Sequence, residues 1–140
     1  MSIQYCVEDV SSPKIQKRKI TNWIKDTIVS EGKITGDISF IFCSDDYLLE
    51  VNKQYLKHDY FTDIITFDYV ADNTISGDIF ISCDRVKENA LEFKIEFLEE
   101  LSRIIIHGVL HLLGYKDKSK KDKALMTQKE DFYLKVLSNS

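Results

Sequence analysis

The sequence lacks several features that would place it in a specialised class. Its 140 residues include one proline, five glycines and three cysteines, without repeats or low-complexity tracts. This composition leaves no candidate for an interdomain linker. The cysteines Cys6, Cys43 and Cys83 form no CxxC pair, which argues against a disulfide framework. Cys43 and Cys83 lie in apolar runs, and we expect them to be small, buried hydrophobic residues.

Long hydrophobic runs and an excess of positive charge are also missing. No uninterrupted apolar stretch approaches the length of a membrane span, and residues 1–10 are polar and acidic where a signal peptide would be apolar. The formal charge of −4 gives no global basic footprint for nucleic acid, although a local patch can still receive a phosphate backbone. We expect one cytoplasmic domain, residues 1–140, without membrane contact.

Hydrophobic periodicity and turn residues predict the order of helices and strands. Ser11-Ser12-Pro13 is typical of a helix start with Pro13 in the first turn, and Ser44 and Asp84 are expected to cap two later helices. The predicted strands are residues 2–7, 36–43, 63–69 and 75–82, the last two forming an antiparallel hairpin. The predicted helices are about 13–29, 44–56, 84–113 with a break near 94–95, and 121–137. This order predicts an α+β fold, a mixed sheet of about four strands packed with four to five helices.

The most informative motif is a pair of histidines near the end of the third helical region. His107 and His111 are four residues apart, so on a helix they project from one face, one turn apart. Gly114 can end that helix, and the following turn can bring Asp117 back toward the imidazoles. Three nitrogen and oxygen donors with an open fourth position are typical of a catalytic zinc site, where the pKa of a bound water falls to about 7. We predict one zinc ion per chain on these residues, with nickel, cobalt or manganese as substitutes.

The helix that carries the histidines leaves a second interpretation open. It is apolar on nearly all sides, which predicts a central, buried helix. A lone histidine on such a helix is more often a hydrogen-bonded core residue than a ligand. Two histidines followed by Gly-x-x-Asp favour the metal site, because burying two imidazoles without strong partners is costly. The apolar residues are Leu101, Ile104, Ile105, Ile106, Val109, Leu110, Leu112 and Leu113.

The same spacing occurs in the long zinc-peptidase motif that has aspartate as its third ligand. In that motif a glutamate directly follows the first histidine and acts as the general base. Here that position is Gly108. A peptidase without this base has no group to carry a proton to its leaving amine, so the residues argue against peptidase activity.

The motif and three further segments resemble a known family. HGVLHLLGYKD, residues 107–117, resembles the HGxLHLxGYDH signature of YbeY-type endoribonucleases. NKQYLKHDYFTDIITF, residues 52–67, is similar to the family segment N-x-x-Y-R-x-x-D-x-x-T-D-V-L-S-F, and Gly77-Asp78-Ile79 to its G-D-I strand. Met126 and Glu130 fit the M-x3-E of its last helix. The likeness runs from about Gly36 to the C-terminus, and four segments with shared spacing form a specific signal.

The resemblance implies a metal-dependent endoribonuclease of single-stranded RNA that acts in late small-subunit rRNA maturation and ribosome quality control. Its implied partners are rRNA and the small ribosomal subunit, and no catalytic group is assigned beyond the metal-bound water. Three positions depart from the family motifs in ways that matter for the chemistry. The family's third histidine falls on Asp117, a competent ligand, and the aspartate before it falls on Lys116. The arginine of its Y-R pair falls on Leu56. Leucine cannot engage phosphate or stabilise developing charge, so this departure concerns catalytic power more than metal binding.

Other polar residues are expected around the cleft. Thr62, Asp63 and Asp78 are predicted to wall it, and Asp63 either orients a histidine or caps a backbone amide at the loop end. Lys116 and Lys118 are expected to contact RNA phosphates, against the alternative of a solvated turn.

Three tyrosines, Tyr55, Tyr60 and Tyr69, also have two interpretations. They are able to stack on unpaired bases, but tyrosine at strand and helix ends usually packs with its hydroxyl in water.

Two other functions stay open on the sequence alone. A zinc-dependent hydrolase of another substrate would use the same ligands. A non-catalytic ribosome-associated factor would account for Leu56.

Overall fold

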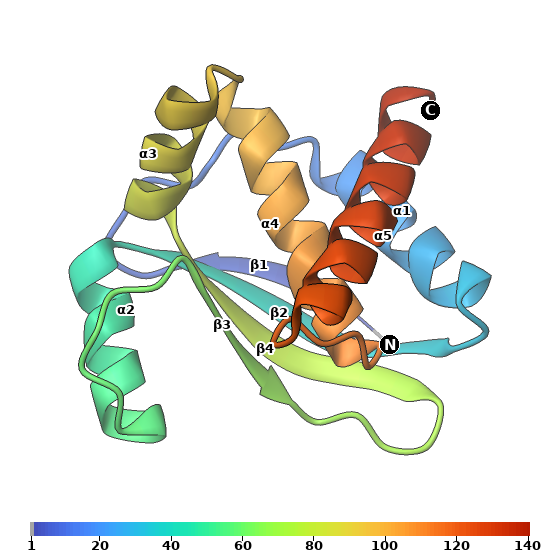
Figure 1. The fold of residues 1–140 in the computed structure, drawn as a ribbon, viewed down its shortest axis with the longest axis horizontal. Coiled ribbons are helices and arrows are strands. Elements are labelled where there is room, and N and C mark those ends of the chain that lie inside the picture. The colour runs from blue at the N-terminus through green and yellow to red at the C-terminus, as the bar shows by residue number, and fades with distance from the viewer. Residues whose placement is uncertain (1) are drawn as a thin grey trace.

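The computed structural model describes residues 2–140 and places helices on both faces of one sheet (Figure 1). The strands are β1 (Ile3–Val7), β2 (Ile34–Cys43), β3 (Ile64–Asp68) and β4 (Thr74–Ser82). The helices are α1 (Lys17–Ser30), α2 (Asp45–Val51), α3 (Cys83–Phe93), α4 (Phe97–Leu112) and α5 (Lys120–Ser138), with a π-helical segment, η1 (Asn52–Leu56), after α2. Within the described residues, four strands and five α-helices confirm the predicted α+β fold.

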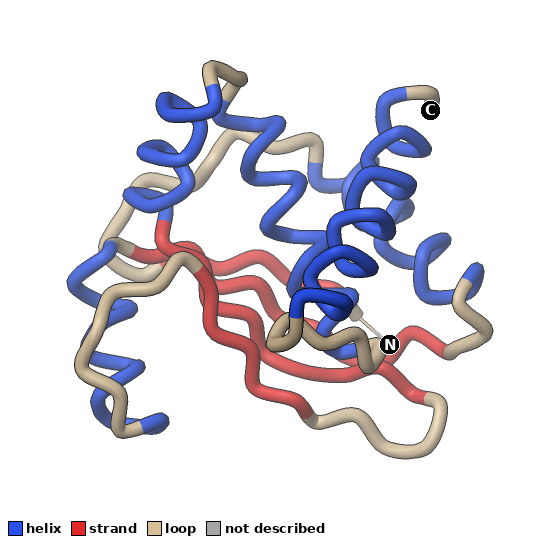
Figure 2. The backbone as a smooth tube through the Cα atoms, viewed as in Figure 1, coloured by secondary structure: helices blue, strands red, loops and turns tan. Residues whose placement is uncertain are grey.

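The sheet is mixed, with strand order β1-β2-β4-β3. β2 runs parallel to both β1 and β4, whereas β3 pairs antiparallel with β4. Ile64 lies opposite Ile81 in that pair, and Thr66 lies opposite Ile79, which confirms the predicted hairpin. The strands form one layer beneath most of the helices (Figure 2).

The main core lies between the sheet and the helices α1, α4 and α5. Alternate residues of β4 are buried on this side because successive side chains of a strand point to opposite faces. Large aliphatic side chains at such positions each contribute about 1.5–3 kcal/mol when fully buried. The buried residues that α1 and α4 contribute include Trp23, Ile24, Ile28, Leu101, Ile105, Ile106, Val109 and Leu110.

Helix α4 approaches the sheet closely at two glycines. A Cβ atom at Gly108 would lie 3.0 Å from the side chains of both Ile64 and Ile79. A Cβ atom at Gly77 of β4 would lie 2.9 Å from Leu112 Cδ2. Position 108 therefore faces the core. His107 and His111 project from a different side of the helix.

A smaller core covers part of the other face of the sheet. Leu48 and Val51 of α2 pack there with Cys43 and Ile65. As predicted, the Ser44 side chain caps α2 by accepting a hydrogen bond from the backbone amide of Tyr47.

Two predicted helix starts are wrong. Pro13 is not in a helix: α1 begins at Lys17, because Val10 and Ile15 pack against the core and hold residues 11–16 in an irregular path. The cap of α3 is Ser82 rather than Asp84, and its side chain accepts from the Arg85 amide at 3.2 Å. The break near Lys94 is confirmed, since Lys94 has a left-handed backbone with φ 58°.

The burial of the cysteines and the character of the helices test the expectations of buried thiols and of no membrane span. Cys43 is buried and Cys83 half-buried, and burial raises the pKa of their thiols to about 12 and about 11. Cys6 is exposed, and all three are free. Between residues 2 and 140, no helix has the length and apolar character needed to cross a bilayer.

Candidate metal centre

The two histidines and Asp117 converge at the C-terminal end of α4. One ligand atom from each of His107, His111 and Asp117 lies within 4.8 Å of the others. His107 Nε2 is 3.6 Å from Asp117 Oδ2, and the two imidazole rings lie 4.7 Å apart between their centroids. All three residues are half-buried, so the donors are shielded but reachable. The structure thus brings the three predicted ligands together.

The turn after α4 explains how Asp117 reaches the histidines. Gly114 has φ 105°, a conformation that favours glycine. Its amide donates to His111 O at 3.0 Å, and the Tyr115 amide donates to Leu110 O at 3.0 Å. These bonds end the helix and reverse the chain, as the sequence predicts.

Glu130 of α5 holds the first histidine in place. His107 Nδ1 donates to Glu130 Oε2 at 2.5 Å, and Arg103 Nη1 donates to Glu130 Oε1 at 2.8 Å. With its proton on Nδ1, His107 has its Nε2 lone pair directed toward Asp117. Sequence reasoning missed this contact. In the sequence, this contact is indicated by the family-like position of Glu130 and by Arg103, which lies one helical turn before His107.

The electrostatic surroundings shift the pKa values of the two imidazoles in opposite directions. Burial lowers the pKa of His107, but the hydrogen bond and charge of Glu130, with Asp117 and Asp63, outweigh burial and raise it above its ordinary value. Burial and the neighbouring His107 lower the pKa of His111. His111 is therefore neutral near pH 7, the form in which an imidazole binds metal.

Changing Glu130 to glutamine is expected to weaken zinc binding about 10-fold or more. Removing the partner that orients a histidine ligand typically lowers metal affinity 10- to 100-fold. The substitution takes away the negative charge between His107 and Arg103 while keeping the side-chain shape. Zinc dissociation constants would be measured by competition with a chromophoric chelator.

Asp131→Asn is the matched control for this measurement. Asp131 also binds Arg103, at 2.8 Å, but is exposed on α5 and has no contact with a histidine. Equal zinc affinities for the Glu130 and Asp131 variants would contradict the orienting role.

Asp63 and Thr62, two further residues predicted to line the cleft, lie at the start of β3. Burial raises the pKa of Asp63, more than the nearby His107 lowers it, and its carboxylate also lies within electrostatic reach of Asp117. Backbone amides of Asp63 and Ile64 also lower this pKa, and the hydrogen bond to His107 Nδ1 is made by Glu130. Thr62 Oγ1 donates to Ile64 O at 3.4 Å in the same turn.

Asp78 does not belong to this site. It alternates along β4 with Gly77 and Ile79, which face α4, so its side chain lies on the opposite face of the sheet, beside Tyr69. The expectation that Asp78 walls the cleft is corrected by this alternation.

A second carboxylate fixes the turn that carries Asp117. Glu31, at the end of α1, accepts hydrogen bonds from Tyr115 at 2.6 Å, from Lys129 at 3.2 Å and from Tyr133. Burial raises the pKa of Glu31, but these donors together lower it below its ordinary value of 4.5. The charged carboxylate therefore stabilises the fold at neutral pH, and this contribution is lost as the pH falls through the lowered pKa.

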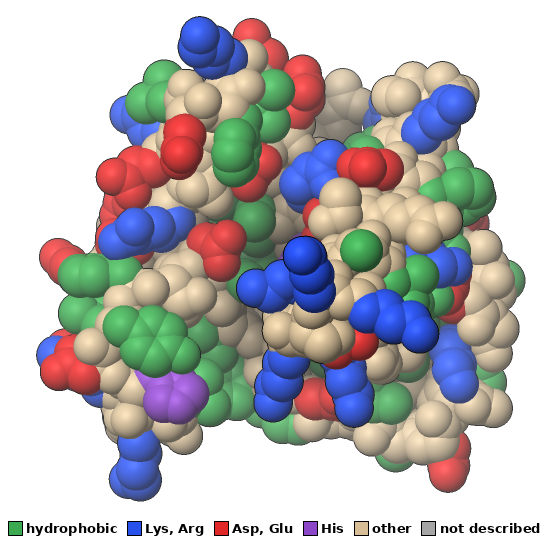
Figure 3. Space-filling view, viewed as in Figure 1, with side chains coloured by type: hydrophobic (Ala, Val, Ile, Leu, Met, Phe, Trp, Pro, Cys, Tyr) green, Lys and Arg blue, Asp and Glu red, His purple; other side chains and the backbone are tan. Residues whose placement is uncertain are grey.

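Basic side chains gather beside the turn. Lys116 and Lys118 flank Asp117, are exposed, and form no ion pair within residues 2–140. In the space-filling view the surface is hollowed between the side of α2 and α3 and the side of α4 and α5, and basic side chains cluster where α5 begins (Figure 3). Their charge is available to an incoming anion.

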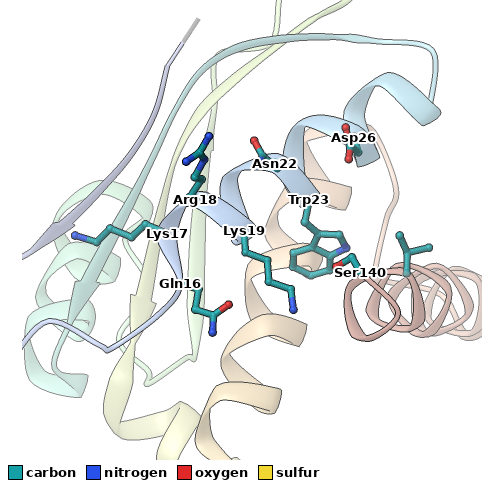
Figure 4. A pocket seen from close by; sticks show the side chains of 9 residues that line it. Gln16, Lys17, Arg18, Lys19, Asn22, Trp23, Asp26 and Ser140 are labelled. Atoms are coloured by element: carbon teal, nitrogen blue, oxygen red, sulfur yellow. The ribbon is translucent and has the colours of Figure 1, made fainter.

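Another hollow lies away from the metal centre, between α1 and the C-terminus (Figure 4). Its volume is about 620 Å³, and its lining includes Lys17, Lys19 and Trp23 but none of the three ligand residues. Cavity size therefore does not mark the site in this chain, whereas the ligand geometry does.

Comparison with known proteins agrees with the geometry. The family described as Endoribonuclease YbeY matches residues 6–138. A Parabacteroides distasonis protein named Endoribonuclease YbeY is 53% identical over 137 residues, which cover 98% of this chain and 96% of that protein. A Flavobacterium psychrophilum protein of the same name is 57% identical over 115 residues, covering 82% of each chain.

The fold is similar to that of a Thermotoga maritima protein whose structure was solved in solution. The TM-score is 0.69 at 28% sequence identity, and the match covers 97% of this chain and 89% of that one. The likeness therefore extends over nearly the whole chain.

Proposed function

Because this chain belongs to the endoribonuclease YbeY family, we propose that it is a metal-dependent endoribonuclease that cleaves single-stranded RNA. The observation that carries the proposal is the convergence of His107, His111 and Asp117, whose ligand atoms lie within 4.8 Å of one another. Hydrolysis of a phosphodiester needs a nucleophile and stabilisation of developing negative charge, and a divalent ion at such a site supplies both.

The donor set fits zinc. Two imidazoles and one carboxylate leave a coordination position open, the arrangement typical of catalytic rather than structural zinc. The aspartate makes the site more tolerant of manganese, cobalt or nickel than a third imidazole would. The hydrogen bond from His107 to Glu130 is the kind of outer contact that metal-binding histidines usually make.

The residues of the chain then have separate tasks. Glu130 keeps the His107 proton on Nδ1, and Arg103 holds the Glu130 carboxylate in position. Tyr115, through its bond to Glu31, fixes the turn from which Asp117 reaches the histidines. Lys116 and Lys118 attract the RNA backbone to this end of α4.

Family membership also supports a cellular role. We propose that the substrate is rRNA in late maturation of the small subunit and in ribosome quality control, with the small ribosomal subunit as partner. The protein would work in the cytoplasm as a single domain, residues 1–140. A compact sheet and one main core that draws on both ends of the chain support the single-domain assignment.

Removing the metal tests the proposed activity. The zinc-loaded protein is expected to cleave an end-labelled single-stranded RNA, to lose this activity after dialysis against a chelator, and to recover it when zinc is restored. A duplex of the same sequence should be cleaved far more slowly. Cleavage products would be followed by gel electrophoresis over time.

The other outcomes separate the alternative functions. Cleavage that persists in the metal-free protein would contradict the proposal. An inactive zinc-loaded protein that co-sediments with small ribosomal subunits would favour the non-catalytic factor, for which the exposed Leu56 in place of the family arginine is the supporting observation. Activity on other esters or peptides but not on RNA would favour a different zinc hydrolase.

A further inference from the structure

Three aromatic side chains lie exposed in the segment that leads into β3. Tyr60 is 55% and Phe61 46% exposed, and the exposed His58 stacks on Tyr60 with ring centroids 5.2 Å apart and planes inclined by 21°. We call His58, Tyr60 and Phe61 the aromatic segment. Water covers these rings although burial would stabilise them, which is typical of a surface that binds a partner.

The aromatic segment is held in one conformation. The buried Asn52 donates its side-chain amide to Tyr60 O at 2.8 Å, and its own carbonyl accepts from the His58 amide at 3.1 Å. The Tyr60 hydroxyl and His58 Nδ1 are 3.1 Å apart, within hydrogen-bonding distance. The Arg85 guanidinium lies 5.2 Å from the centre of the Phe61 ring. The rings are therefore presented in fixed positions, which lowers the entropy cost of binding a ligand.

The aromatic segment precedes Asp63, a residue close to the metal centre. Phe61 is two residues before Asp63, whose carboxylate lies within electrostatic reach of both His107 and Asp117. The segment passes beside α2 into β3, on the side of the hollow opposite α4 and α5 (Figures 1 and 3). The aromatic segment thus lies on the side of α2, and the turn that carries Lys116 and Lys118 lies on the side of α5 (Figure 1).

We propose that the aromatic segment stacks on unpaired bases of the RNA beside the cleaved phosphodiester. This inference rests on the proposed nuclease function and extends it to the choice of substrate. Aromatic platforms next to a basic groove are how proteins hold single strands without reading their sequence. A paired base has both faces covered by its neighbours and cannot stack on a side chain, so the aromatic segment selects single-stranded RNA.

Binding measurements on variants test the inference. The His111→Ala protein would be used so that the RNA is not cut, with fluorescence anisotropy of a labelled 12-nucleotide single strand, an oligomer length of about one to three such sites. Adding Tyr60→Leu is expected to weaken binding about 10-fold, because one base–aromatic stack typically contributes that much. The slope of affinity against salt should not change, since no phosphate contact is lost.

Two controls separate stacking from other effects. Phe132→Leu removes a ring on α5 that is 57% exposed but lies outside the aromatic segment, and it should leave binding unchanged. Replacing Lys116 and Lys118 by alanine should make the salt slope shallower. An RNA with abasic sites should bind the unchanged and Tyr60→Leu proteins equally, because it has no base to stack.

Unchanged RNA binding by the variants of the aromatic segment would overturn this inference alone. If Tyr60→Leu and His58→Ala bind the intact single strand as well as the control variant does, the aromatic segment is not a base platform, whatever the nuclease activity. If the wild type fails to cleave RNA while Tyr60→Leu still loses base-dependent binding, the nuclease proposal fails and the binding surface stands.

Discussion

Replacing His111 by alanine is expected to lower RNA cleavage by about 100- to 1,000-fold without unfolding the protein. Loss of one of three ligands leaves an incomplete site, and losing one preorganised source of charge stabilisation typically costs a factor of 10² to 10³. His111 is half-buried at the end of α4 and forms no hydrogen bond with another described side chain, so the core is retained. Cleavage rates would be measured with both proteins at equal zinc concentration.

Ser102→Ala is the control for that comparison. Ser102 lies on the same helix, and its hydroxyl donates to Leu98 O at 2.8 Å. The two variants should unfold at similar temperatures by circular dichroism, while only His111→Ala loses bound zinc. A His111→Ala protein that cleaves RNA at the wild-type rate would rule out the three-ligand centre as the source of activity.

Replacing Gly108 by glutamate is expected to prevent folding or to destabilise the protein by about 3–5 kcal/mol. The substitution would supply the residue found after the first histidine in zinc peptidases. Here it would put a carboxylate against Ile64 and Ile79, where even a Cβ atom lies only 3.0 Å from both side chains. Urea unfolding followed by tryptophan fluorescence would measure the change, because Trp23 is buried in the main core.

A glutamate elsewhere on the helix provides the comparison. Leu98 is 46% exposed in the first turn of α4, where a negative charge is also favourable to the helix dipole. Leu98→Glu should change the free energy of unfolding by less than about 1 kcal/mol. A stable Gly108→Glu protein with peptidase activity would contradict both the packing argument and the nuclease assignment.

Local patterns in the sequence were sufficient to predict the three residues of the candidate metal centre and most of the helices and strands. The four-residue spacing of His107 and His111 depends only on helical geometry, and the turn at Gly114 depends on a residue that tolerates positive φ. Both are properties of short segments. The same is true of the Ser44 cap and of the break at Lys94.

The remaining features depend on contacts between distant segments. The bond between His107 and Glu130 joins α4 to α5, and the bond between Tyr115 and Glu31 spans most of the chain. No local pattern encodes such a pairing. Asp78 is a different case, because the two-residue period of its strand already placed it on the face opposite Gly77 and Ile79.

The position of Glu130 near the C-terminus sets when the site can be completed during synthesis. The ligands on α4 leave the ribosome before α5, the helix that supplies the partner of His107 and two of the donors to Glu31. A nascent chain that ends before α5 therefore has no carboxylate to orient His107. The candidate metal centre is completed only when α5 has been synthesised and packs against α4.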